Sequence, residues 1–159
     1  MKNLILLSAF FMLSTNYAKA QSTFTIPELE KLSTSNSSDF ETYILKKGYS
    51  YQSSLSDLKN KLYWYDGKRP NGRIDQIVRA VDSTVVFTTT SKQYYLDIKS
   101  ALVNNGYEYF FEKNKDVLDM PTTWYYYANK KFISIIYSYT TSDGIATYQI
   151  HVFKSTHSY

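Results

Sequence analysis

The residues best suited to acid–base or metal chemistry are the two histidines, His151 and His157, in a chain of 159 residues without cysteine. Histidine titrates near neutral pH and is a common metal ligand, but a metal site needs further ligands at characteristic spacing. Asp97 and Asp143, the acidic residues that would have to complete such a site, show no signature spacing with either histidine. We therefore predict no metal and no cofactor, and we interpret His151 as a surface residue of the last strand.

Nucleophilic catalysis has little support in the sequence. There is no thiol, no serine lies in a Gly-x-Ser-x-Gly turn, and the five glycines are too dispersed to form a phosphate-binding loop. A glycosidase needs two facing carboxylates, whereas these aspartates fall mostly at turns or strand ends: Asp57, Asp66, Asp75, Asp116 and Asp119. We predict that the protein is not an enzyme. A hydrolase that assembles Ser, His and Asp from distant positions stays open as an alternative.

Aromatic residues give the strongest functional signal. Residues 62–65 (Leu-Tyr-Trp-Tyr) and 124–127 (Trp-Tyr-Tyr-Tyr) are strand-like, and a strand places alternate side chains on opposite faces. Because tyrosine tolerates water better than leucine or tryptophan, we expect the tyrosine face to be exposed and to bind a partner. The alternative is that these rings only pair across strands and stabilise the sheet. The predicted partner-binding residues are Tyr63, Tyr65, Tyr125, Tyr127, Lys61 and Arg79.

The N-terminus has the pattern of a cleaved signal peptide. Lys2 precedes an apolar run over residues 4–13, and Ala18-Lys19-Ala20 supplies small residues where a signal peptidase cleaves. The run is shorter than the roughly 20 residues that span a bilayer, so we expect no membrane span. We predict cleavage after Ala20 and a periplasmic or secreted location.

The net charge argues against a nucleic-acid partner. Removing Lys2 and Lys19 with the signal peptide lowers the net charge from +4 to +2. The mature chain also lacks a dense stripe of lysine and arginine, which is the electrostatic footprint of nucleic-acid binders. The predicted partner is an unidentified protein or a component of the cell envelope, and the oligomeric state stays open.

An internal repeat organises the chain. Residues 39–51 match residues 97–109, with four identical positions and coincident apolar positions. Each copy predicts a helix that ends at Gly48 or Gly106 in a left-handed cap, followed by a strand with a Tyr-x-Tyr pattern. Residues 62–65 and 124–127 continue the likeness more loosely, which predicts a longer loop over residues 116–121 in the second copy.

Further elements follow from spacing and turn signals. Residues 27–32 predict a short helix with Thr25 or Ile26 near its cap and Pro27 in its first turn, and residues 33–38 form a link. Ser91 predicts the cap of a longer helix. Residues 73–81, 84–90, 131–140 and 145–154 predict strands, with a hairpin turn at Asp143-Gly144.

These elements predict an α+β fold of two tandem repeats, each with one or two helices followed by about four antiparallel strands. The predicted segments are a signal peptide (1–20), a first α/β repeat (21–90) and a second α/β repeat (91–159). The two repeats are expected to form one compact unit, from which the signal peptide is excluded. This pattern resembles the architecture of β-lactamase inhibitor proteins over residues 22–155, and more loosely that of small secreted proteins of PepSY-like fold. The resemblance implies that the two sheets join, with the helices on one side.

We therefore predict an exported, non-enzymatic binding module that holds a protein, as an inhibitor or an immunity factor does, through an aromatic face of its sheet. A binder of cell-envelope glycans or peptides is the main alternative, because sugar rings also stack on aromatic side chains. The dispersed-site hydrolase is the second alternative.

Overall fold

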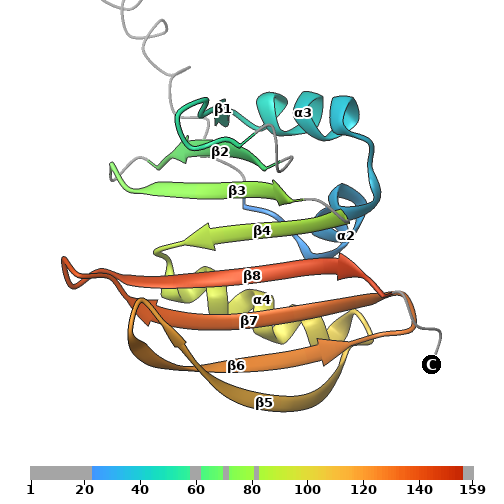
Figure 1. Cartoon of the computed structure of the whole chain (residues 1–159). Coiled ribbons are helices and arrows are strands. Elements are labelled where there is room, and N and C mark those ends of the chain that lie inside the picture. The colour runs from blue at the N-terminus through green and yellow to red at the C-terminus, as the bar shows by residue number, and fades with distance from the viewer. Residues whose placement is uncertain (1–22, 58–61, 70–71, 81–82, 156–159) are drawn as a thin grey trace, which may run out of the picture.

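Eight strands form a single antiparallel sheet with three helices in the computed structural model (Figure 1). The structure describes residues 23–57, 62–69, 72–80 and 83–155. The order across the sheet is β1-β2-β3-β4-β8-β7-β6-β5. The strands are β1 (Ser50–Tyr51), β2 (Tyr63–Lys68), β3 (Ile74–Ala80), β4 (Thr84–Thr89), β5 (Glu108–Val117), β6 (Met120–Ala128), β7 (Phe132–Thr140) and β8 (Ala146–Lys154). The predicted α+β class is confirmed, and a strand lies at each predicted position, although β5 and β6 extend well beyond the residues predicted for them.

Side-chain caps fix where the helices begin. The helices are α2 (Ile26–Thr34), α3 (Ser37–Lys46) and α4 (Lys92–Asn104). Thr25 and Glu28 form a reciprocal capping box at the start of α2, in which the Thr25 N–H donates to Glu28 Oε2 over 2.7 Å. Asn36 caps α3, and Ser91 caps α4 as predicted. The link between α2 and α3 is shorter than expected, because α2 continues to Thr34.

Two glycines end α3 and α4 in the same way. Gly48 and Gly106 have φ angles of 87° and 75°, a left-handed conformation that residues with a Cβ rarely adopt. The next residue donates back to the last turn in each case, from Tyr49 N–H to Ile44 O and from Tyr107 N–H to Leu102 O. This is the Schellman arrangement, which satisfies carbonyls at a helix end. The predicted left-handed caps are confirmed.

The predicted longer loop over residues 116–121 is wrong. β5 and β6 instead continue as a long hairpin, in which Val117 pairs with Met120 around a tight turn at Leu118 and Asp119. Both turn residues have positive φ angles, 51° and 59°, as the twist of a two-residue hairpin requires. The sequence lacks the Asn-Gly or Asp-Gly signal of such a turn, so its pattern did not indicate a hairpin.

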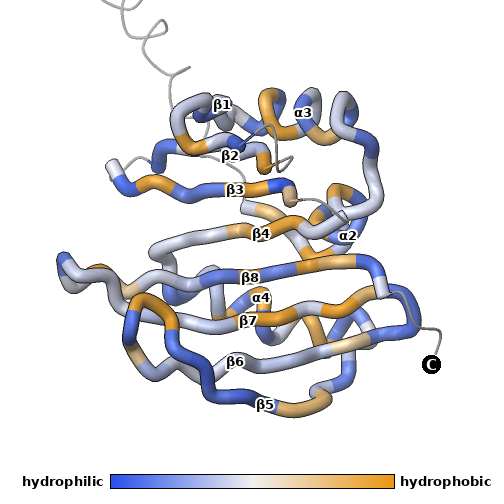
Figure 2. The backbone as a smooth tube through the Cα atoms, viewed as in Figure 1, coloured by the Kyte–Doolittle hydropathy of each residue, from blue (hydrophilic) through white to orange (hydrophobic). Residues whose placement is uncertain are grey.

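The hydrophobic core lies between the helices and one face of the sheet, which we call the helix face. Cross-strand register joins one row of this face through Tyr65, Ile77, Phe87, Ile150 and Ile136. All five are buried in the same cluster as these helical residues: Ile26, Leu29, Leu32, Phe40, Ile44, Ile98 and Leu102. Figure 2 shows hydrophobic stretches in the helices and in the central strands that they cover. Burial of these apolar side chains is the main stabilising contribution to the fold.

The described helices are all short. None of them is both long enough and apolar enough to cross a membrane. The predicted signal peptide, residues 1–20, lies outside the described residues.

Candidate functional site

The tyrosines predicted to form an exposed binding face lie on the helix face instead. Tyr65 and Tyr127 belong to the core, with only 2% and 5% of their surface exposed, and Tyr63 and Tyr125 pack partly buried against it. The expectation that this face is exposed is therefore wrong. Lys61, the basic residue predicted beside them, lies outside the described residues.

Register explains why these rings are covered. Tyr63 pairs with Arg79 and Tyr65 with Ile77, which places them in phase with the apolar positions of β3 and β4 that face the helices. Arg79 also lies under a helix, with its guanidinium carbon 5.4 Å from the centre of the Phe40 ring of α3. The predicted residues that the structure describes thus share one face, but it is the face that the helices cover.

The opposite face of the sheet has no helix packed on it among the described elements, and we call it the open face (Figure 1). One cross-strand row runs over it through seven strands and is apolar except for one histidine. We call this set the open-face row. Its members are Trp64, Val78, Val86, His151, Ile135, Tyr126 and Phe111.

Polar side chains lie beside the open-face row. Register joins Asp66, Gln76, Thr88, Gln149 and Tyr137 in a second row across β2, β3, β4, β8 and β7. Gln76 Nε2 donates to Asp66 Oδ1 over 3.0 Å. The open face therefore offers an apolar strip with hydrogen-bonding groups along one side, which is the composition of a surface that binds a partner.

The Trp124 indole is enclosed on both of its faces. The Tyr137 ring stacks on it at a centroid separation of 4.1 Å and an interplanar angle of 7°, and Lys115 Nζ lies 4.2 Å from the indole centroid. The indole N–H is buried without a hydrogen-bond partner in the described structure. Because both ring faces are occupied, a sugar cannot stack on Trp124 unless Lys115 moves away.

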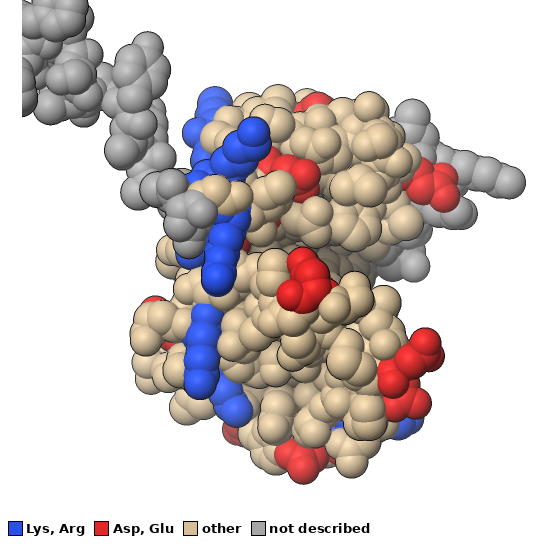
Figure 3. All heavy atoms as spheres, turned by 90° about the vertical axis from the view of Figure 1, so that its left-hand side faces the viewer, with Lys and Arg blue, Asp and Glu red and all other residues tan. Residues whose placement is uncertain are grey.

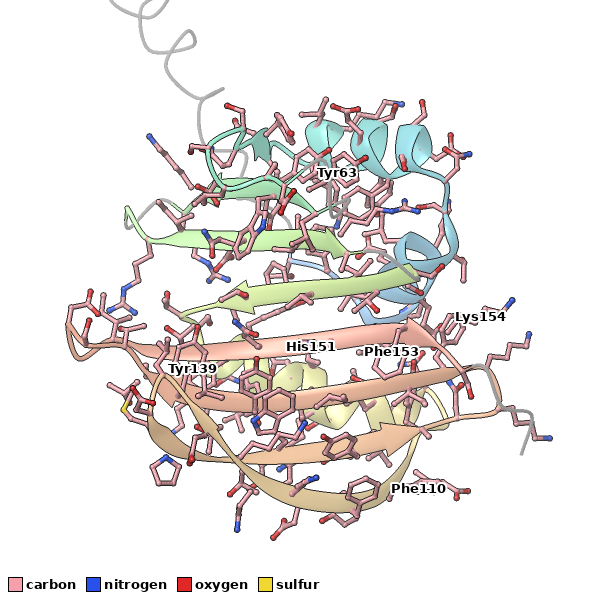
Figure 4. All side chains as sticks on the ribbon, in the orientation of Figure 1. Tyr63, Phe110, Tyr139, His151, Phe153 and Lys154 are labelled. Atoms are coloured by element: carbon pink, nitrogen blue, oxygen red, sulfur yellow. The ribbon has the colours of Figure 1, made fainter. Side chains whose placement is uncertain are left out.

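A hydrogen-bonded cluster surrounds His151 in the middle of the sheet (Figure 4), and the His151 ring centroid lies 6.1 Å from that of Trp124. The Tyr137 hydroxyl donates to Gln149 Oε1, and Gln149 Nε2 donates to the Tyr139 hydroxyl over 3.3 Å. His151 Nε2 lies 3.3 Å from the Tyr137 hydroxyl and 3.2 Å from Gln149 Oε1. Its partners in the described residues are thus neutral groups, without the carboxylate that orients a catalytic histidine.

Burial sets the charge state of the cluster. It lowers the pKa of His151 from 6.5 to about 4, and the nearby Lys115 ammonium acts in the same direction. Burial also raises the pKa of Tyr137 to about 12. Both groups are therefore neutral near pH 7, whereas a general base works best with a pKa close to the working pH. This cluster is better suited to noncovalent contact than to proton transfer.

The low pKa of His151 predicts acid sensitivity. The unfolded chain binds a proton at a pKa of 6.5 and folded His151 only at about 4, so stability present above about pH 6.5 is lost as the pH falls toward about 4. The loss is about 2–3 kcal/mol of unfolding free energy. Urea unfolding of the wild type and of His151→Gln at about pH 7, 5 and 4 measures it, with a smaller loss expected in the variant. An equal pH dependence in both proteins would contradict a buried, neutral His151.

The charged side chains of the described residues form no candidate metal site. Those residues contain no group of three or more His, Cys, Asp or Glu side chains that could hold a metal ion. In the view of Figure 3, lysine and arginine side chains form a column along one margin, whereas aspartate and glutamate are scattered.

Comparison with known proteins adds no functional assignment. The chain matches no protein-family model, no curated protein and no solved structure.

Proposed function

We propose that this protein is an exported, non-enzymatic binding module that holds a partner protein on the open face of its sheet. The observation that carries the proposal is the open-face row, an almost continuous apolar strip that no described helix covers. Phe111 is 48% exposed, Val78 is buried at 6%, and the other five members are half-buried, so the strip is a partly accessible apolar surface. A contiguous accessible apolar surface often marks a site of interaction.

The size of the row supports a protein as the partner. Seven neighbouring strands are separated by six spacings of about 4.8 Å, so the row extends over roughly 29 Å. A standard protein–protein interface covers about 800 Å² on each partner. The side of a square with that area is similar to the length of the row. A single sugar ring would need only one exposed aromatic face, and the faces of Trp124 are already occupied.

We also propose that the two halves of the sheet arose by tandem duplication, as the resemblance to β-lactamase inhibitor proteins implies. Strands β1–β4 and β5–β8 each lie in chain order and meet where β4 pairs with β8. The Gly48 and Gly106 caps have the same hydrogen bonds. Each half also pairs a tyrosine of its first strand with one of its second, Tyr51 with Tyr65 and Tyr109 with Tyr127. Joining two such halves would create an open face wide enough for a protein partner.

A pull-down with matched variants tests the binding function. The test variant carries Phe111→Ala, Tyr126→Ala and Ile135→Ala, which shorten the open-face row at one end. We expect it to bind the captured partner at least about 100-fold more weakly, because truncating a hot-spot side chain of an interface costs about 2 kcal/mol or more and the variant truncates three large apolar side chains.

The control variant carries Leu96→Ala and Val103→Ala, two exposed apolar residues of α4. It removes exposed apolar surface from a helix and is expected to bind like the wild type. Both variants are first compared with the wild type by circular dichroism. Equal binding by the folded test variant would refute the open face as the binding surface.

A further inference from the structure

β5 occupies one end of the sheet and has a free edge among the described strands. It is the last strand in the sheet order and pairs only with β6. Its ten residues contrast with the two residues of β1 at the other end. Every residue from Glu108 to Asp116 is exposed. From Phe111 onward, an exposed edge of this kind presents its outward backbone N–H and C=O groups to an additional strand.

Three consecutive aromatic residues lie exposed near the beginning of β5. Tyr109, Phe110 and Phe111 are 52%, 53% and 48% exposed, and the register shifts by one residue between Tyr109 and Phe111. Such a bulge is one way in which proteins limit uncontrolled pairing at a sheet edge. The regular part of the edge therefore begins at Phe111 and continues to Val117.

The charges of this regular part are separated between the two faces of the strand. Lys113 pairs with Trp124 and Lys115 with Thr122, which places both lysines on the open face. Glu112 pairs with Tyr125, so Glu112 and Asp116 lie on the other face. The middle of β5 is hydrophilic between more hydrophobic ends, as Figure 2 shows. None of these four charged side chains forms a salt bridge within the described residues.

This separation disfavours pairing between two copies of the chain. In an antiparallel pair centred on Asn114, Phe111 lies opposite Val117, but Lys113 lies opposite Lys115 and Glu112 opposite Asp116. A two-fold axis repeats both contacts, so the pair contains two contacts between lysines and two between carboxylates. Like charges directly opposite each other destabilise a strand pair. The edge thus repels its own copy while its backbone stays available.

We infer that β5 binds an extended segment of a partner protein as a ninth strand, and that this segment carries acidic side chains on the open face and basic side chains on the other. Acidic side chains there meet Lys113 and Lys115, and basic side chains meet Glu112 and Asp116. Backbone hydrogen bonds supply affinity, and the alternating charges select the partner and its register. The edge is distinct from the open-face row except at Phe111, which belongs to both.

Two peptides of identical composition test the selection of charge. The matching peptide, Leu-Lys-Glu-Thr-Glu-Lys-Val-Thr, runs antiparallel to β5 and opposes each charge. In the control peptide each Lys is replaced by Glu and each Glu by Lys. The matching peptide forms four opposite-charge pairs with β5, whereas the control peptide forms four like-charge pairs. We therefore expect the wild type to bind the matching peptide at least about tenfold more tightly than the control peptide in fluorescence anisotropy. A protein with E112K, K113E, K115E and D116K is expected to prefer the control peptide.

A second variant tests whether the edge is free to pair. K115E with D116K converts every like-charge contact of the self-pair into an opposite-charge contact, and we expect it to form a dimer in sedimentation experiments where the wild type stays monomeric. K113E with K115E keeps the like-charge contacts and is expected to stay monomeric.

A lack of preference between the peptides, a preference that does not invert, or a monomeric K115E/D116K protein would each overturn the inference. None of these results would refute the proposed binding function. That function is tested separately, by the pull-down that compares the wild type with the variant whose open-face row is shortened.

Discussion

Tyr127→Ala is expected to lower the free energy of unfolding by about 3–5 kcal/mol, and Tyr65→Ala by a similar amount. Both rings lie in the core between the helices and the sheet, and Tyr65 contacts the Phe40 ring of α3 at a centroid distance of 5.8 Å. Removing either ring leaves a cavity that the surrounding side chains fill only in part. Urea unfolding followed by circular dichroism measures the loss.

The neighbouring residue provides a matched control. Tyr126 has the same side chain as Tyr127 but lies on the open face, where it stacks on Phe111 at 4.4 Å. Tyr126→Ala is expected to cost only about 1 kcal/mol, which is typical of one partly exposed aromatic pair. Equal losses in Tyr126→Ala and Tyr127→Ala would contradict the assignment of the two faces. Replacing Tyr63, Tyr65, Tyr125 and Tyr127 together would remove much of the core, so such a variant would report on folding and not on binding.

Arg69→Ala is expected to destabilise the protein by about 3–5 kcal/mol near neutral pH. Arg69 Nε lies 2.6 Å from Asp75 Oδ2, and Arg69 Nη2 donates to Thr89 Oγ1 over 3.1 Å. Asp75 is only 2% exposed, and its Oδ1 has no hydrogen-bond partner in the described structure. Loss of the guanidinium therefore leaves a buried carboxylate without its charged partner.

The pH dependence identifies the cause of this loss. Burial raises the pKa of Asp75 above its usual 3.8, against the opposing effect of Arg69. A raised pKa means that the folded protein holds the proton more tightly, so ionisation of Asp75 costs stability as the pH rises. The difference between wild type and Arg69→Ala is therefore expected to shrink in acid, where Asp75 is protonated. Adding Asp75→Asn to Arg69→Ala is expected to recover part of the stability, and a double variant as unstable as Arg69→Ala would show that the loss has another origin.

Local sequence signals were sufficient for most of the secondary structure. The start of α2 follows from Thr25 and Pro27, that of α4 from Ser91, and the two helix ends from Gly48 and Gly106. These predictions succeed because a cap or a left-handed glycine depends on a few adjacent residues. The turn at Leu118 and Asp119 was missed because neither residue is typical of that conformation, which the pairing of β5 with β6 imposes.

The candidate site was only half predictable from the sequence. The alternation of side chains along a strand correctly predicts that Tyr63 shares a face with Tyr65, and Tyr125 with Tyr127. It also correctly places Trp64 and Trp124 on the opposite face. Both faces of β2 and β6 are aromatic, however, so composition did not distinguish the covered face from the open one. The preference for exposed tyrosine was wrong because a buried tyrosine ring can fill a core as phenylalanine does.

The sequence by itself determined which side chains share a face, because the alternation of a strand is a local property of the backbone. The tertiary structure decided which face is covered. Apolar residues of α2 and α4, among them Leu29, Ile98 and Leu102, pack on the face that carries Ile77, Phe87 and Ile150. Only the tertiary structure reveals the open-face row and the position of β5 at the edge of the described strands, since both depend on residues that are distant in sequence and are brought together by the sheet.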